Sequence, residues 1–160
     1  MSSAKVINTS HTLLNYTMAL NPPLEDFIRY ASTISCLNLN VTTGRGDNLL
    51  SLSALQGNYQ RVAYILNNMV SGKGLLNKAN KQGWTPLHYA ACHHWNNEGN
   101  ALETVKVLVL AGANIHAKTR EKTDWSISNG ISFPKGLTAL EIANKVGNVD
   151  VSQYLAQYSR

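Results

Sequence analysis

The chain has 160 residues, of which 44% are hydrophobic, so it can enclose the core of one domain. No apolar run reaches about 18 residues and no shorter apolar segment stands at the start, so we expect neither a membrane span nor a secretory signal. Cys36 and Cys92 lack a CxxC spacing, which argues against a zinc ribbon or a disulfide scaffold. The net charge of +5 favours an anionic partner, and the scatter of the basic residues argues against nucleic acid.

The first clear helix signal lies near residue 24. Asn21-Pro22-Pro23 supplies a capping residue and prolines, and Leu24 is followed by two acids, a combination that is typical of a helix start. Apolar residues then recur at helical spacing, at Phe27, Ile28, Tyr30, Ala31 and Ile34. The segment before Asn21 fits either a short helix or a disordered stretch.

The most informative stretch is Thr85-Pro86-Leu87-His88-Tyr89-Ala90-Ala91. Thr85 suits the N-cap of a helix, and Pro86 suits the first helical position, where its missing N–H would be unpaired anyway. His88 stands three residues after the cap, so a ring nitrogen can bond the Thr85 hydroxyl or nearby backbone. Residues 102–108 predict a second helix, which ends at a turn around Gly112.

Two other segments repeat this pattern with different capping residues. In residues 46–66, Asn48 is the predicted N-cap and Ser51 takes the place of His88. In residues 136–155, Thr138 precedes a short apolar helix, and Glu141 takes that place. Each copy continues through a glycine turn into a second apolar helix.

These residues resemble the ankyrin repeat family, most specifically at Thr85-Pro86-Leu87-His88. The resemblance implies an all-α fold, an ankyrin-repeat solenoid of stacked helix-turn-helix repeats with short β-hairpin tips and a helical N-terminal cap. Residues 1–42 would form that cap or a degenerate half-repeat. Three repeats would follow, at about 43–79, 80–113 and 114–160.

The spacing of equivalent leucines predicts two insertions. Leu50 and Leu87 are 37 residues apart, and Leu87 and Leu140 are 53 apart, against an ankyrin period of about 33. The second excess divides between residues near 92–100 and residues near 119–135. Insertions in repeat proteins map to loops on one face, which is often the binding face.

The resemblance also implies a function. It favours a non-enzymatic protein–protein interaction module, an adaptor or inhibitor, that binds a partner protein through its concave groove and hairpin tips. The alternative is a regulatory or accessory subunit of an enzyme encoded on another chain. We expect a cytoplasmic protein, or one in the host-cell cytosol if it is a secreted bacterial effector, a role that the asparagine-rich composition fits. No cofactor is expected, and no membrane, nucleic-acid or small-molecule partner.

Carried over position by position, the resemblance predicts partner contacts in the middle repeat at Lys81, Gln82, Trp84, Tyr89, Cys92 and His93. A basic cluster and an aromatic residue around the long insertion add Lys118, Arg120 and Trp125. Trp84 and Tyr89 are the best anchor candidates, because aromatic residues are enriched in hot spots. The alternative is that Trp84 packs on the neighbouring hairpin.

The long insertion contains apolar residues in an otherwise polar stretch, namely Trp125, Ile127, Ile131 and Phe133. They either fold back on the groove beside Trp84 or form a contact patch for the partner, and the third alternative is that the stretch is disordered.

A metal site is the remaining chemical hypothesis. His88 and Cys92 are four residues apart and share a helix face, as a zinc pair would. The capping role of His88 turns its ring toward Thr85, and a complete site would need His116 or an acid from another loop. We therefore expect no metal ion and no catalytic residue.

Overall fold

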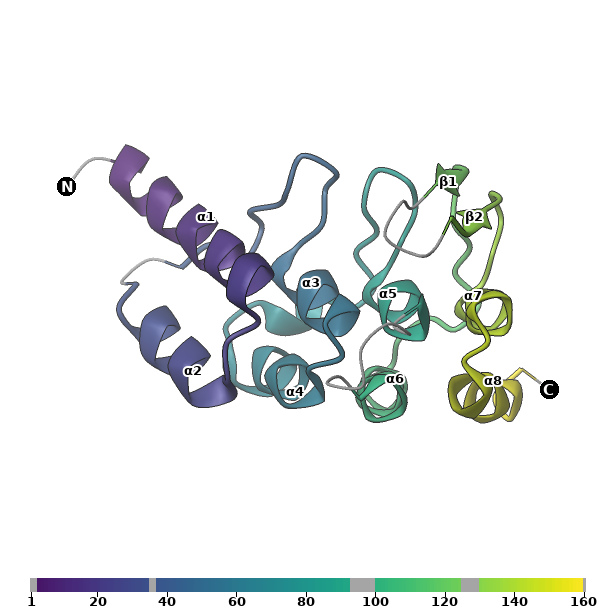
Figure 1. Ribbon diagram of the computed structural model, residues 1–160. Helices are drawn as coiled ribbons and strands as arrows, with labels where there is room; N and C mark the ends of the chain where they lie inside the picture. Colours follow the sequence, from purple (N-terminus) through teal and green to yellow (C-terminus); the bar gives the residue numbers. More distant parts are fainter. Residues whose placement is uncertain (1–2, 35–36, 93–99, 125–129, 160) are drawn as a thin grey trace.

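The computed structural model describes residues 3–34, 37–92, 100–124 and 130–159. Within these ranges the chain forms eight α-helices, one short 3-10 helix and one two-stranded antiparallel sheet (Figure 1). The elements are α1 (Ser3–Leu20), α2 (Leu24–Ser32), α3 (Leu49–Leu55), α4 (Tyr59–Asn68), η1 (Gly72–Leu75), α5 (Pro86–Cys92), α6 (Ala101–Leu110), β1 (Thr123–Asp124), β2 (Ser132–Phe133), α7 (Ala139–Val146) and α8 (Val149–Ala156). The predicted all-α solenoid is confirmed.

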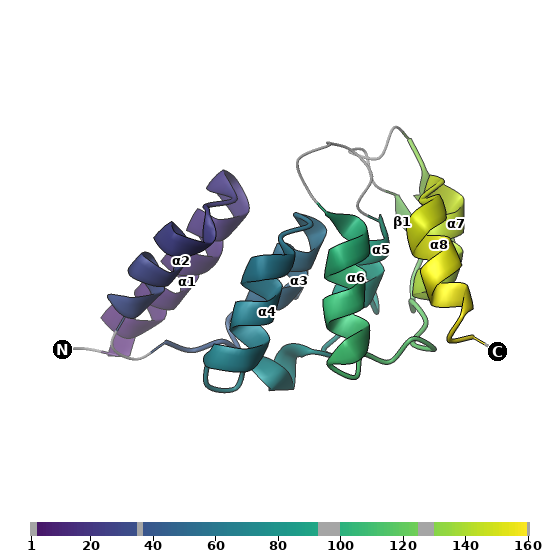
Figure 2. The same cartoon turned by 90° about the horizontal axis from the view of Figure 1, so that it is seen from below.

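The helices form two rows that run from one end of the molecule to the other (Figures 1 and 2). One row holds α1, α3, α5 and α7, and the other holds α2, α4, α6 and α8. Each pair packs on the next pair along the chain, which places the core between successive pairs. This arrangement is how helical repeats hide apolar faces that no single pair can bury alone.

Helices α3, α5 and α7 begin with side-chain caps, as their sequences predict. The Asn48 side chain accepts a hydrogen bond from the Ser51 amide, and Thr138 and Glu141 form the equivalent capping box at α7. At α5 the Thr85 amide donates a hydrogen bond to Nδ1 of His88, and the Thr85 hydroxyl also contacts this nitrogen. Three different residue pairs thus satisfy the same unpaired amides at a helix start.

The leucines used for the spacing argument differ in burial. Leu50 and Leu87 are buried to 1% exposure or less, whereas Leu140 is only partly buried. In the described part of the chain, Leu140 belongs to the last helix pair and has no further pair stacked upon it. Burial along a solenoid depends on having a neighbour on each side.

The N-terminal segment is a complete helix pair. Before Asn21 the chain is helical as α1, and α1 and α2 continue the two rows by packing on α3 and α4 (Figure 1). The sequence pattern left helix and disorder open for residues before Asn21, and the structure has the helix.

A buried arginine holds this N-terminal pair against the next one. The Arg61 guanidinium in α4 donates hydrogen bonds to the Pro22 carbonyl at 3.1 Å, the Asn21 side chain at 3.1 Å and the Ser53 hydroxyl at 2.8 Å. It also bonds the Gln56 side chain and lies over the Phe27 ring. Burial lowers the pKa of Arg61 to about 10, so the group is still a cation at neutral pH.

Candidate functional site

Three connecting segments project from the same side of the molecule (Figure 1). They are residues 37–48 before α3, residues 76–85 before α5 and residues 114–138 before α7. We call the exposed surface of these three segments the loop edge.

Each segment of the loop edge is closed by an equivalent backbone hydrogen bond. The Thr43 amide donates to the Asp47 carbonyl at 2.9 Å, and the Asn80 amide donates to the Trp84 carbonyl at 2.9 Å. In the third segment the Thr119 amide donates to the Leu137 carbonyl at 2.9 Å. The first two turns span four residues and the third spans eighteen, so the third turn contains fourteen additional residues around β1 and β2.

Neighbouring turns are bonded to each other through their backbones. The Lys81 amide donates to the Arg45 carbonyl at 3.0 Å, and the Arg120 amide donates to the Gln82 carbonyl at 2.8 Å. Gly83 allows the third turn to lie this close to the second. Its φ is +85°, which favours glycine, and a Cβ at this position would lie 2.6 Å from the Arg120 amide nitrogen. The loop edge is therefore one continuous surface.

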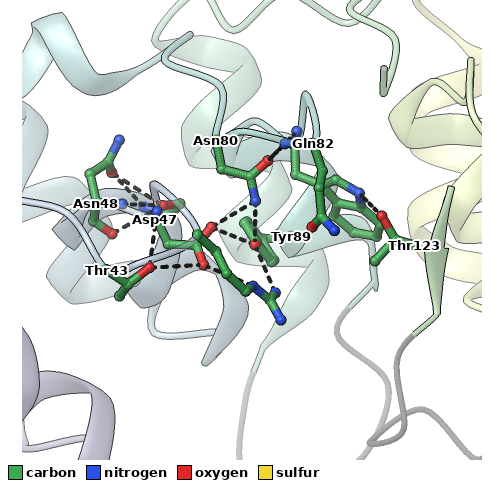
Figure 3. Close-up of polar contacts among 10 residues, drawn as sticks. Thr43, Asp47, Asn48, Asn80, Gln82, Tyr89 and Thr123 are labelled. Carbon is green, nitrogen blue, oxygen red and sulfur yellow. Dashed lines mark hydrogen bonds and ion pairs between the residues drawn. The ribbon is translucent and has the colours of Figure 1, made fainter. Parts of the chain in front are cut away.

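A buried polar network ties the first turn, the second turn and α5 together (Figure 3). The carboxylate of Asp47 accepts hydrogen bonds from the Tyr89 hydroxyl at 2.5 Å and from the Asn80 amide at 2.9 Å. Arg45 lies 3.6 Å from the same carboxylate. Burial and the adjacent Asp47 charge raise the pKa of Tyr89 well above its usual range, so its hydroxyl is a donor at all physiological pH values.

Trp84 lies in the core under the long insertion. Its side chain is 1% exposed, and its indole N–H donates to the Thr123 hydroxyl at 3.1 Å. The Phe133 ring meets it edge-on, with ring centroids 5.3 Å apart. Phe133 is fully buried beside Trp84, and Ile131 is partly buried against the core, so both insertion residues fold back onto the protein. Trp125 and Ile127 lie outside the described residues.

His88 joins the cap of α5 to the third turn. Its Nδ1 accepts from the Thr85 amide at 3.0 Å, so Nε2 carries the proton and donates to the carbonyls of Ala117 and Leu137 at 3.0 and 3.1 Å. Burial lowers the pKa of His88, although the two carbonyl acceptors partly oppose that shift. Both ring nitrogens are thus used in structural hydrogen bonds.

The structure separates the candidate contact residues into two groups. Trp84, Tyr89 and Cys92 are each 1% exposed, so their side chains offer no area to a partner. Burial also raises the pKa of the Cys92 thiol to about 12, which makes it unreactive at neutral pH. The proposed contact surface therefore excludes all three.

The remaining candidates lie at the loop edge or outside the described residues. Lys81, Lys118 and Arg120 are exposed, and Gln82 is half-buried. His93 and Trp125, both predicted contacts, fall in segments that the structure does not describe.

A cleft of about 360 Å³ opens in the loop edge between the first two turns. Leu39 and Leu75 form its apolar floor, and Lys78, Lys81 and Arg120 stand around it. Lys78 and the floor leucines were missing from the sequence-based candidates. The signal that would have found Lys78 is its place in the turn segment that also carries Lys81.

The described residues show neither a metal-binding cluster nor a membrane-spanning helix. Across the described ranges, no three His, Cys, Asp or Glu side chains are grouped so that they could hold a metal ion. None of the described helices has the length and apolar character needed to cross a bilayer.

Comparison with known proteins agrees with this architecture. A family model described as ankyrin repeats matches residues 14–119 in three copies, which is more than half of the chain. No curated protein matches the chain significantly. The matched region begins within α1 and ends at the start of the third turn, so it covers the stack from the N-terminal helix pair through α6.

Proposed function

Because the chain belongs to the ankyrin repeat family, we propose that it is a non-enzymatic adaptor or inhibitor that binds a partner protein with its loop edge. Ankyrin repeats are protein–protein interaction modules and are typically non-catalytic. What we propose beyond the family assignment is that the loop edge makes the contact and that the chain acts as an adaptor or inhibitor.

One observation supports the loop edge over helices α3 and α5. All seven residues of α5 are buried, as are residues 49–54 of α3, so these two helices present almost no side chains to a partner. The turns, in contrast, expose Lys81, Lys118 and Arg120 on a backbone that is bonded from turn to turn. A rigid surface with exposed side chains loses little conformational entropy on binding, which favours recognition.

Photo-crosslinking from defined positions tests the proposal. One variant carries a benzophenone amino acid in place of Lys118 on the loop edge, and its matched control carries it in place of Tyr59, which is exposed on α4. After irradiation in cell lysate, we expect a discrete protein adduct from position 118 and none from position 59. Adducts from position 59 alone, or from neither position, would contradict the proposal.

The same adduct distinguishes the adaptor from the accessory subunit. If the crosslinked protein is an enzyme whose rate changes when the purified chain is added, the chain is a regulatory or accessory subunit. If its activity is unchanged while its binding to a third protein increases or falls, the chain is an adaptor or inhibitor of assembly.

A further inference from the structure

We infer that the loop edge recognises an acidic, extended peptide segment of the partner, with carboxylates bound by Lys78, Lys81 and Arg120. An apolar side chain of the same segment would lie in the cleft against Ala79, which lines the cleft and is exposed, above the buried Leu39 and Leu75. This inference rests on the proposed function, because it names the chemistry of the partner that the loop edge binds.

The distribution of charge is the first argument. The three segments of the loop edge carry seven of the fourteen Lys and Arg residues and three of the nine Asp and Glu residues. They thus account for four of the five net positive charges of the chain, and the helices with their other connections are close to neutral. A surface of one sign steers a partner of the opposite sign and raises the rate of association.

None of the three acids of the loop edge, Asp47, Glu121 and Asp124, is among the described residues that line the cleft. Asp47 is 5% exposed and its carboxylate is used by Tyr89 and Asn80. Asp124 lies 3.1 Å from Lys122, in the long insertion. Among the described residues that line the cleft there is no Asp or Glu, so its three cations face no acid within it.

Two of the three cations are positioned by hydrogen bonds to the turns. The Lys78 ammonium donates to the Asn40 side chain at 2.8 Å, and Arg120 donates to the Asn80 carbonyl at 2.9 Å. Each has further donors for a bound carboxylate, because an ammonium has three N–H groups and a guanidinium has five. Lys81 is exposed and also lines the cleft.

The shape and lining of the cleft favour a peptide over a nucleic acid. The cleft has two buried leucines at its floor, and none of the described residues that line it is aromatic, so they offer no ring for a base to stack upon. An aliphatic side chain fills such a floor, and carboxylates on either side reach the rim. An extended acidic segment with one central leucine combines both features.

Fluorescence anisotropy with a labelled probe tests the inference. The probe is the peptide Gly-Asp-Glu-Leu-Asp-Glu-Gly, and its neutral counterpart is Gly-Asn-Gln-Leu-Asn-Gln-Gly. The test variant is Lys81→Gln with Arg120→Gln. The matched control is Arg29→Gln with Lys106→Gln, which removes the same charge from exposed ion pairs on α2 and α6. Urea unfolding of both variants checks that the fold is retained.

We expect the acidic probe to bind the natural chain and the neutral peptide to bind far more weakly. The test variant is expected to lose about tenfold or more in affinity, because each lost contact is a charge-assisted hydrogen bond, and the control is expected to change by less than about twofold. Added salt should weaken binding of the acidic probe to the natural chain more than its binding to the test variant.

Three results would overturn the inference. They are equal binding of the acidic and neutral peptides, equal losses in the test and control variants, and a single-stranded oligothymidine that binds more tightly than the acidic probe through the same two residues. If one of these is found while position 118 still crosslinks a protein, the partner is not acidic but the proposed function stands. Absence of crosslinking from position 118 would remove the proposed function itself.

Discussion

The hydroxyl of Tyr89 lies 2.5 Å from a carboxylate oxygen of Asp47, although the two residues are 42 positions apart in the chain. This hydrogen bond joins α5 to the first turn of the loop edge. Asn80, in the second turn, forms hydrogen bonds with both Asp47 and Tyr89. Tyr89 is therefore a framework residue that sets the spacing of two turns, and the cleft lies at the junction of those turns.

The first prediction concerns this bond. Tyr89→Phe should lower the free energy of unfolding by about 1–3 kcal/mol, because the buried Asp47 carboxylate loses a donor. Tyr59→Phe, at an exposed position of α4, should change it by less than about 0.5 kcal/mol. Urea denaturation followed by circular dichroism measures both. Equal effects would show that the hydrogen bond does not contribute to stability.

The second prediction is a pH dependence from His88. Its pKa is lowered in the folded state, so the unfolded chain binds more protons below the ordinary pKa of about 6.5. The stability from neutral His88 is complete above that value and should fall as the pH drops below it. His88→Gln should lose part of this dependence, because Gln caps the helix without titrating. Urea midpoints of both proteins across the range from neutral to mildly acidic pH test it, and parallel curves would contradict it.

The third prediction concerns the N-terminal helix pair. Arg61→Met leaves the buried acceptors of Pro22 and Ser53 without their donor. Each unsatisfied acceptor should lower the free energy of unfolding by about 1–3 kcal/mol. Because Arg61 bonds the α1–α2 connection directly, we expect amide hydrogen exchange to increase first in α2 and later in α5. Arg29→Met, on the exposed surface of α2, is the control. Uniformly faster exchange along the whole chain would mean that Arg61 does not act locally.

The fourth prediction separates framework from surface in the middle repeat. Leu87→Ala should cost about 2–5 kcal/mol, because Leu87 is 1% exposed in the core. Lys81→Ala should be close to neutral, because its side chain is exposed. Urea unfolding would contradict the assigned register if the two variants lost similar stability.

The fifth prediction concerns the long insertion. Phe133→Ala should lower the free energy of unfolding by about 3–5 kcal/mol, because Phe133 is fully buried against Trp84. Lys135→Ala, two residues later and exposed, should have little effect. Thermal unfolding measures both. A small loss at Phe133 would mean that the insertion contributes contact area for a partner instead of core.

The local features of this protein followed from its sequence. The caps at Asn48, Thr85 and Thr138 and the turns that separate the helices depend on residues within a few positions of one another. Short-range hydrogen bonds and steric preferences decide such features, so a pattern of seven residues was enough to identify the helix starts and the repeat family. Lys81 was predicted as a partner contact from the family resemblance and Arg120 from the basic cluster around the insertion, and both side chains are exposed.

Only the tertiary structure decided that the aromatic candidates Trp84 and Tyr89 belong to the core and not to the surface. Trp84 and Tyr89 occupy positions that vary on the surface of ankyrin repeats, yet both are buried by residues at least 39 positions away in the chain, Thr123 and Asp47. Phe133 covers Trp84 because the third turn has fourteen additional residues. Burial is a property of contacts between distant segments, and no periodicity within one repeat specifies what a neighbouring insertion will cover.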